Sequence, residues 1–403
     1  MVSRVKIFSY VFASLFIALI GFKVYFYFTH NVPPKFQLEG LFDSKTYQSE
    51  VNCTLKASNS YKVANMSFAL DGKPFDLNDI KKIGSSKFEI PFKLDTRDLA
   101  EGKHTLLVKA TDGSFNANES IQTLDFFVDN KPLKAALLQS EYKIDQGRTI
   151  HVRINANKEM EKVVVSFISK IYECFPESEG SIVYECFIPL DCEEESAEHK
   201  ITALLEDKVG NSLNLSGKVT INAYPFKKAV GFVVDREKLK QEEEVSISDK
   251  VLKDALEKWV KDSPKQKLWA GRFDLPMNVT RIATPFGEIR TTIEKGKYYH
   301  KAVDLVNLPR SVIWASQTGK VIIKDRYSFT GNTVVLDHGR GIHTLYFHLD
   351  EFSPGLEVGD LVKKGNPVGR LGKTGYASGY HLHWELRVNN IPVDPMQWIQ
   401  RSF

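Results

Sequence analysis

The segment His381-Leu-His-Trp-Glu-Leu-Arg-Val388 decides the fold class that we expect for the C-terminal part of the chain. Apolar and polar residues alternate along it, and this period of two is typical of a β-strand with one buried face. Leu382 and Trp384 then face the core, whereas both imidazoles and Glu385 point to the opposite side. The segment therefore predicts a strand that carries a pair of histidines on one face.

The surrounding sequence shows the same alternation in shorter stretches. Strands are expected over residues 319–323, 332–336 and 344–347, and glycine-rich turns separate them. We therefore expect residues 268–403 to form a β-rich domain.

Histidines are concentrated in this domain, which holds six of the ten in the chain. In His300-Lys-Ala-Val-Asp304 the spacing is even, so an extended chain would present both side chains on one side. Two imidazoles and one carboxylate suit zinc and leave a fourth coordination position for water. His338 and His343, in contrast, are expected to be structural residues at loops or strand ends. The six are His300, His338, His343, His348, His381 and His383.

The order and spacing of several motifs resemble the lysostaphin/LytM-type zinc metallopeptidases, which cut peptidoglycan. The similarity covers about residues 270–400. The matching segments are Thr284-Pro-Phe-Gly287 with Arg290, His300-Lys-Ala-Val-Asp304, Asn332-Thr-Val-Val-Leu-Asp-His-Gly339, Leu345-Tyr-Phe-His-Leu349, Val358-Gly-Asp-Leu-Val-Lys-Lys-Gly365, and Gly372-Lys-Thr-Gly375 followed by His381-Leu-His-Trp-Glu385.

This resemblance implies roles for five side chains. His300, Asp304 and His383 would bind one zinc ion. His348 and His381 would flank the zinc-bound water that attacks the scissile carbonyl. The His-Glu-x-x-His motif of other zinc peptidases is absent from the sequence, so an imidazole must act as the base while the other stabilises the oxyanion.

The resemblance also implies a substrate, with two departures from the family pattern. Ala302 stands where the family often has glycine, and Leu308-Pro-Arg-Ser311 replaces a glycine-containing turn. These two departures bear on substrate preference more than on the metal site.

The activity that the resemblance implies is hydrolysis of the peptide crosslinks of peptidoglycan. The alternative is a non-enzymatic LytM-like activator or scaffold that binds cell-wall amidases, a role taken by relatives that have lost ligands. The presence of all five polar residues favours the enzyme.

Charge narrows the range of partners. The net charge is only +4, which argues against a general nucleic-acid-binding protein. Residues 265–403 carry 19 lysines and arginines against 12 acidic residues, whereas residues 31–264 carry 32 against 38. A basic C-terminal domain suits an anionic polymer such as the cell wall, although solvated surface charge would give the same count.

The N-terminal sequence predicts a membrane helix. Arg4 and Lys6 precede an apolar run over residues 7–28, which at about 1.5 Å per residue can cross a hydrocarbon core of about 30 Å. The basic start should stay in the cytoplasm. We therefore expect residues 1–30 to be a cytoplasmic start and transmembrane anchor in the inner membrane, with the bulk of the chain in the periplasm or another extracytoplasmic space. A cleaved signal peptide is the alternative, but a small-x-small cleavage site does not follow the run.

The sequence between the anchor and the histidine-rich domain predicts two similar β-domains. Alternating stretches and turn signals such as Asp71-Gly72 are typical of an all-β fold. A motif recurs after 95 residues, the length of one sandwich domain: His104, Asp112 and Asn116 return as His199, Asp207 and Asn211. The repeated segments resemble the last strands of bacterial immunoglobulin-like domains. We therefore expect tandem domains at 35–130 and 131–224, which provide reach or bind a protein partner.

A charged segment precedes the C-terminal domain. Apolar residues between 251 and 260 fall on one helix face, with Ser248 as the expected N-cap and Pro264 beyond the end. Residues 225–267 are therefore predicted to be a helical linker, or else a partner-binding or autoinhibitory helix.

Four cysteines fit an oxidising compartment. Cys174 and Cys186 lie in similar segments that predict a hairpin, and Cys192 follows closely. One disulfide among these three is expected.

Overall fold

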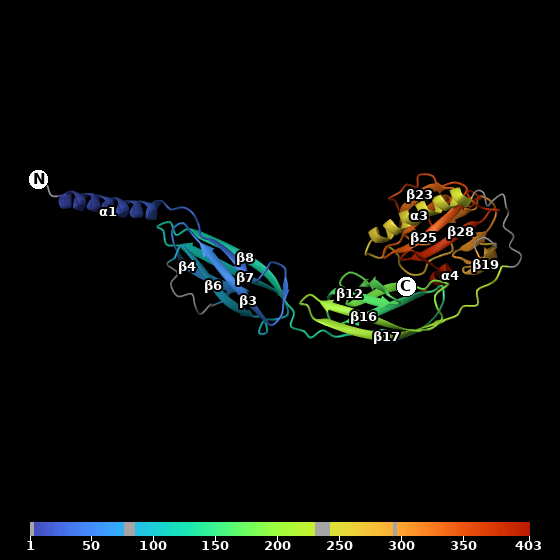
Figure 1. Cartoon of the computed structure of the whole chain (residues 1–403), viewed down its shortest axis with the longest axis horizontal. Coiled ribbons are helices and arrows are strands. Elements are labelled where there is room, and N and C mark those ends of the chain that lie inside the picture. Colours follow the sequence, from blue (N-terminus) through green and yellow to red (C-terminus); the bar gives the residue numbers. More distant parts are fainter. Residues whose placement is uncertain (1–3, 76–84, 230–241, 293–295) are drawn as a thin grey trace. The chain divides into compact units, whose positions relative to one another are not determined.

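The computed structural model describes residues 4–75, 85–229, 242–292 and 296–403. The chain is mainly β, as predicted, and divides into two compact units (Figure 1). One unit comprises residues 1–133 with 207–211, and the other comprises residues 134–206 with 212–403.

The first described element is the predicted apolar helix, α1 (Arg4–Thr29). Its segment Ser9–Thr29 is long and apolar enough to cross a membrane and is not buried within the protein. The helix is therefore a candidate membrane span. A signal sequence near the N-terminus would have the same properties.

Two sheets pack face to face in the first unit. Leu55 of one sheet and Leu106 and Phe126 of the other are fully buried in the core that the sheets share. The first sheet has the order β1 (Lys35–Glu39), β3 (Glu50–Ser58), β6 (Lys87–Asp95). The second has the order β2 (Thr46–Tyr47), β8 (Glu119–Val128), β7 (Gly102–Asp112), β4 (Val63–Leu70), β5 (Lys73–Pro74).

A second sandwich in the other unit has the same strand order, except that one of its sheets has a fourth strand at the edge. One sheet runs β9 (Ala135–Leu137), β11 (Thr149–Ala156), β15 (Val183–Pro189), β14 (Phe175–Pro176). The other runs β10 (Glu141–Asp145), β17 (Ser212–Asn222), β16 (Glu198–Asp207), β12 (Met160–Phe167), β13 (Lys170–Glu173). In both sandwiches the short strand at the sheet edge pairs in parallel with the last strand, β2 with β8 and β10 with β17. The internal repeat is therefore present in the strand order, and the relation to immunoglobulin-like domains remains a prediction.

The repeated aspartate of the sequence motif has a structural role in the turn that follows its strand. The Asp112 carboxylate accepts from the backbone N–H of Ser114 at 3.1 Å, and the Asp207 carboxylate accepts from that of Val209 at 3.1 Å. These contacts account for the recurrence of the aspartate, and the asparagine bonded to it is Asn118 in the first sandwich and Asn211 in the second.

The cysteines differ from expectation. Cys174 and Cys186 lie next to each other, on the hairpin that the sequence predicted, but all four cysteines are free thiols in the core. The disulfide expected among Cys174, Cys186 and Cys192 is not formed. Burial raises the pKa of the Cys192 thiol to about 12.

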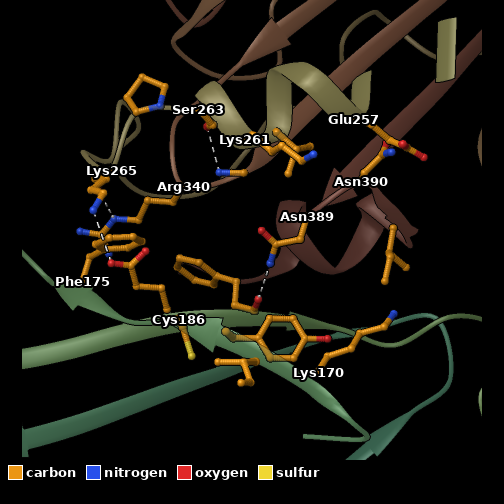
Figure 2. Close-up of a pocket in the computed structure, with 18 of the residues that line it drawn as sticks. Lys170, Phe175, Cys186, Glu257, Lys261, Ser263, Lys265, Arg340, Asn389 and Asn390 are labelled. Atoms are coloured by element: carbon orange, nitrogen blue, oxygen red, sulfur yellow. Dashed lines mark hydrogen bonds and ion pairs between the residues drawn. The ribbon is translucent and has the colours of Figure 1, made fainter. Parts of the chain in front are cut away.

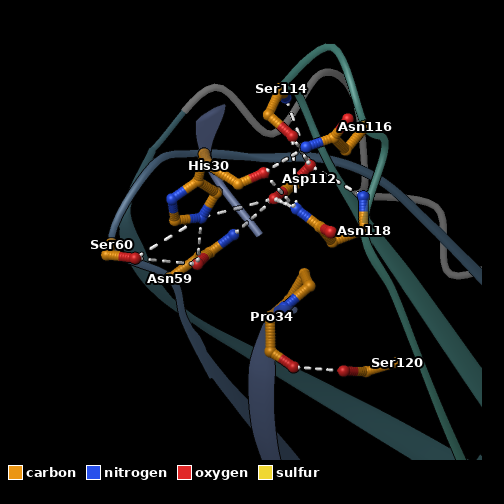
Figure 3. A network of polar contacts seen from close by, with 9 residues as sticks. All are labelled: His30, Pro34, Asn59, Ser60, Asp112, Ser114, Asn116, Asn118 and Ser120. Atoms are coloured by element: carbon orange, nitrogen blue, oxygen red, sulfur yellow. Dashed lines mark hydrogen bonds and ion pairs between the residues drawn. The ribbon is translucent and has the colours of Figure 1, made fainter. Parts of the chain in front are cut away.

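The end of α1 is fastened directly to the first sandwich (Figure 3). His30, the residue after the helix, is buried, and its carbonyl accepts from Asn116 Nδ2 at 2.8 Å and Asn118 Nδ2 at 3.1 Å. Its ring Nε2 lies 3.4 Å from the buried carboxylate of Asp112. The turn between β7 and β8 therefore encloses the residue that ends the helix.

The predicted linker helix is α3 (Glu242–Asp262). Pro264 lies just beyond its end, as expected, but the prediction of Ser248 as N-cap is wrong because Glu242–Glu244 are already helical. Glutamates favour the first turn of a helix, where their charge complements the helix dipole, so the helix includes the acidic run.

The C-terminal domain is built on one large, mixed-length sheet with two small two-stranded sheets beside it. Its strands begin and end close to the predicted limits. The large sheet has the order β18 (Arg281–Thr284), β21 (Val303–Val306), β28 (Leu382–Val388), β25 (Ile342–Leu349), β24 (Gly331–Asp337), β23 (Gly319–Tyr327), β26 (Leu361–Val362), with β29 (Ile391–Val393) also paired to β28. The small sheets are β19 (Glu288–Thr292) with β20 (Gly296–His300), and β22 (Val312–Trp314) with β27 (Pro367–Arg370); α4 (Pro395–Gln400) ends the fold.

The two faces of the large sheet differ. Leu382 and Trp384 are fully buried on one face, as the alternation predicted. On the other face Phe347 lies opposite His383, and their rings stack with centroids 5.2 Å apart. Helix α3 packs on this second face, where Leu252 and Leu256 join a cluster with Phe347 and residues of β23, β24 and β25 (Figure 1). The helix and His383 therefore share one face of the sheet.

The second sandwich packs against the C-terminal domain in the same unit. Gln397 of α4 donates to the Thr149 carbonyl at 3.0 Å, and Arg340 donates to the fully buried Glu185 at 2.6 Å. Beside these contacts a cavity of about 830 Å³ lies between β13–β15, the C-terminal half of α3 and the turn at Asn389 (Figure 2).

Candidate metal centre

Three strands bring the candidate ligands together. The register of β21 and β28 places Asp304 directly opposite His383. His300 is the last residue of β20, which belongs to the small sheet with β19. The chain bends between β20 and β21, so the expectation that one extended strand presents His300 and Asp304 is wrong, although their side chains do meet.

The three ligand atoms form a nearly equilateral triangle. His300 Nε2 lies 3.2 Å from Asp304 Oδ1, His383 Nδ1 lies 3.2 Å from the same oxygen, and the two nitrogens are 3.3 Å apart. Ligand atoms at zinc bonds of about 2.0–2.1 Å in a tetrahedron lie about 3.3–3.4 Å apart. The separations and the donor set therefore fit a zinc ion with an open fourth position, and this group is one that could hold a metal.

The electrostatics of the triangle favour a cation. Burial alone would raise the pKa of Asp304, but its hydrogen bonds with His300 and His383 hold that pKa well below the usual range. Burial lowers the pKa of His383, and the hydrogen bonds with Asp304 and Glu385 outweigh burial and raise it to about 9. The carboxylates of Asp304 and Glu385 thus favour positive charge around His383, and a bound metal ion would supply that charge.

Side chains behind His383 fix the orientation of its ring. Glu385 Oε1 lies 3.0 Å from His383 Nε2, and Arg387 Nε donates to the other oxygen of Glu385 at 2.6 Å. This contact leaves Nδ1 to face Asp304. Carboxylates that bind the outer nitrogen of a metal-ligating histidine set its tautomer in the same way.

His348 and His381 lie side by side next to the triangle, with ring centroids 4.9 Å apart. His348 Nδ1 donates to the Thr374 carbonyl at 2.9 Å, and His381 Nδ1 donates to the Gly379 carbonyl at 2.9 Å. Each ring therefore keeps the lone pair of Nε2 free, and that of His381 lies 3.9 Å from Asp304 Oδ1. The sequence predicted that His381 lies within β28, but the residue immediately precedes this strand.

The backbone and the pKa of His348 are both unusual. Its φ is 61°, in the left-handed region that a non-glycine residue enters only when its surroundings hold it there. Burial and the neighbouring His383 and His381 lower the pKa of its imidazole to about 3. His348 is therefore neutral near pH 7.

The remaining histidines of the domain lie away from the triangle. His338 follows β24 and His343 is the second residue of β25, both at strand ends as expected, and both are fully buried. Burial lowers the pKa of each to about 4.

Sequence reasoning missed the groups that orient the site. The carbonyls of Thr374 and Gly379, which hold the two histidine rings, belong to a glycine-rich loop whose path the alternation pattern cannot give. Arg387 could have been found, because it follows Glu385 at the same period of two.

Comparison with protein families and relatives identifies the region of the site. Residues 298–395 match the model of Peptidase family M23. A DD-carboxypeptidase/endopeptidase, Mpg, of Neisseria meningitidis serogroup B is 35% identical over 127 residues, which are 31% of this chain and 29% of that protein. The peptidoglycan DD-endopeptidase ShyB of Vibrio cholerae is 35% identical over 98 residues, or 24% of this chain and 22% of that protein. The match thus spans less than a third of the length of either relative.

Two solved structures are similar to parts of the chain. A peptidase M23 structure from Pseudomonas aeruginosa covers 63% of this chain and 93% of that one, with 20% sequence identity and a TM-score of 0.39. Lysostaphin from Staphylococcus simulans covers 30% of this chain and 49% of that one, with 26% identity and a TM-score of 0.26. Residues 298–395, the range that contains His300, Asp304, His348, His381 and His383, are therefore a peptidase family M23 domain.

Proposed function

We propose that the chain is a membrane-anchored, zinc-dependent endopeptidase that hydrolyses peptide crosslinks of peptidoglycan. The observation that carries this proposal is the triangle of His300, Asp304 and His383, whose separations match tetrahedral zinc. The names of the relatives, a DD-carboxypeptidase/endopeptidase and a peptidoglycan DD-endopeptidase, support the substrate class.

The histidines beside the triangle would handle protons. A zinc ion held by the three ligands would supply Lewis-acid activation of water and of the scissile carbonyl. His381 Nε2, the nearer of the two free lone pairs to Asp304, accepts the proton of the attacking water. Because both rings already donate through Nδ1 to a carbonyl, neither can stabilise an oxyanion through Nε2 until that nitrogen is protonated. His381 reaches that state when it accepts the proton of the water, and it then donates to the oxyanion and passes the proton to the leaving amine, whereas neutral His348 orients the water as an acceptor through Nε2.

The other parts of the chain would determine where this reaction takes place. We propose that α1 is an uncleaved anchor and that the bulk of the chain lies in the periplasm or another extracytoplasmic space. The two sandwiches provide reach or a surface for a protein partner, and the crosslink is D-Ala to diaminopimelate in a Gram-negative envelope or a glycine bridge in other walls.

Digestion of purified sacculi tests the proposal. The detergent-solubilised full chain, loaded with zinc, is expected to remove crosslinked dimers from the muropeptides resolved by mass spectrometry. Treatment with a chelator should abolish this loss, and added zinc should restore it. Zinc-loaded protein that leaves the dimers intact but stimulates an added cell-wall amidase would show instead the non-enzymatic activator.

A further inference from the structure

The turn between β7 and β8 touches the last residues of α1. Phe115, at the tip of this turn, donates its backbone N–H to the Tyr27 carbonyl at 3.0 Å. Its ring lies 6.2 Å from that of Tyr27 and 5.0 Å from that of Phe28, centroid to centroid. A residue far from the helix in sequence is thus level with the last turn of the helix.

A second side chain joins this group from the turn between β3 and β4. The ring of Tyr61 lies 5.9 Å from Phe26 and 6.3 Å from Tyr27. Lys62 Nζ lies over the Tyr61 ring at 5.9 Å, so a cation borders the rings. Tyr27, Phe28, Tyr61 and Phe115 are called the aromatic collar below.

Hydrogen bonds hold the turn that carries Phe115 in place. His30 is enclosed by Asn116 and Asn118, which stand on the same turn as Phe115, and Asp112 orders the start of that turn. Phe115 therefore cannot retreat from the helix end without breaking hydrogen bonds to a buried residue. Its side chain is nevertheless 63% exposed, and that of Phe28 is 51% exposed.

The depth of the collar follows from these contacts. Tyr27 and Phe28 belong to the segment Ser9–Thr29 that is apolar enough to span a bilayer. A side chain in ring contact with them must lie at the same depth, at the end of the span. Aromatic rings concentrate at that depth in membrane proteins, where one edge is apolar and the other is hydrated.

We propose that Phe115 and Tyr61 insert into the interfacial layer of the bilayer that α1 crosses, so that the first sandwich binds the lipid surface directly. The partner is the boundary between headgroups and acyl chains, with Lys62 facing anionic headgroups. This inference rests on the proposed membrane anchoring. In addition to the anchor, the first sandwich itself then contacts the membrane surface.

Depth-dependent quenching tests the insertion. The four native cysteines are buried, so a cysteine introduced at an exposed position can be labelled selectively with an environment-sensitive fluorophore. Full-length Phe115→Cys is labelled and reconstituted in vesicles of phosphatidylethanolamine and phosphatidylglycerol that contain a lipid with a nitroxide at headgroup depth. Phe42→Cys is the matched control, because Phe42 is 56% exposed in the same sandwich and outside the collar. Tyr61→Cys is a second test position, and Phe22→Cys, in matched vesicles whose nitroxide lies deep in the acyl chain, reports on α1.

We expect at least twofold stronger nitroxide quenching at positions 115 and 61 than at 42, with blue-shifted emission. Equal quenching at 115 and 42, with strong quenching at 22, would refute insertion while leaving the anchor intact. Absence of quenching at 22 as well would mean that α1 does not cross the bilayer, and both proposals would fail. Protection of position 115 from the nitroxide lipid and from aqueous iodide alike would show that a protein covers the collar, which also overturns the proposal.

Discussion

At the metal centre, neighbouring histidines make different contacts and should respond differently to the same substitution. His383→Ala removes one of three ligand atoms, so zinc and activity should both be lost. His381→Ala leaves the triangle intact and should keep zinc while the rate falls by about 10²–10⁴-fold. His348→Ala should likewise keep zinc and lose about 10²–10⁴-fold, because the ring that orients the attacking water is removed. Zinc content per molecule and hydrolysis of crosslinked muropeptides check each variant.

His199→Ala provides the control for these variants, because this histidine lies in the second sandwich. Zinc lost from His381→Ala but kept in His383→Ala would reverse the two assignments. His338 and His343 are poor controls because both are fully buried, and their replacement by alanine would leave cavities in the sheet.

The sequence was informative about the residue types of the site and less so about their geometry. Period two put His383 and Glu385 on one face, and the two side chains are in contact there. The bend between His300 and Asp304 was not predictable, because it depends on which sheet each strand joins. That choice follows from pairing with strands distant in sequence, such as β28 with β21.

Among the elements, α3 covers the face of the sheet that holds the candidate metal ligands. Leu256→Ala should lower the free energy of unfolding by about 2–5 kcal/mol, because Leu256 is fully buried against that face. If α3 obstructs a peptide that approaches the ligands along this face, the weakened packing should also raise the rate of crosslink hydrolysis. Chemical denaturation and muropeptide analysis measure the two effects.

Val251→Ala is the matched control, since Val251 is on the same helix and exposed. It should change neither quantity appreciably. A rate that falls in Leu256→Ala in proportion to the loss of folded protein would show that α3 supports the sheet and does not obstruct it.

Strands were easier to predict than the limits of the helix. Short apolar runs over 319–323 and 332–336 located β23 and β24, although most residues of these two strands are buried and their burial does not alternate. The start of α3 was misplaced since Ser248 and Glu242–Glu244 can each begin a helix, and only the backbone shows which one does so. Pairing order within the sheets depends on contacts between distant segments and was outside the reach of local patterns.

For the whole molecule, the second sandwich and the M23 domain should unfold together. Glu185 of the sandwich is fully buried and contacts Arg340 at 2.6 Å and Lys267 at 3.0 Å, both from the C-terminal side of α3. Glu185→Ala removes the buried carboxylate that pairs with these cations and with His151, and it should cost about 3–5 kcal/mol. All five tryptophans lie between residues 259 and 398, so their fluorescence reports mainly on the α3 and M23 region, and Trp398, which donates to Thr149 of the sandwich, also reports on the contact between the two parts. We expect the tryptophan-monitored transition to shift in Glu185→Ala.

Glu198→Ala is the control in the same sandwich. Glu198 forms an exposed ion pair with Lys218, and its loss should cost less than about 1 kcal/mol. An unchanged tryptophan transition in Glu185→Ala, with the sandwich destabilised by circular dichroism, would mean that the two parts unfold independently.

If α1 anchors the chain as proposed, its direct join to the first sandwich at His30 would link the thickness of the bilayer to the orientation of that sandwich. The apolar segment Ser9–Thr29 of α1 has 21 residues and is therefore about 32 Å long, close to the roughly 30 Å of a hydrocarbon core. Helices of excess length tilt, and they tilt further in thinner bilayers. Since a flexible spacer does not separate Thr29 from the buried His30, the sandwich must rotate with the helix. Bilayer thickness would then set the angle at which this part of the chain leaves the membrane.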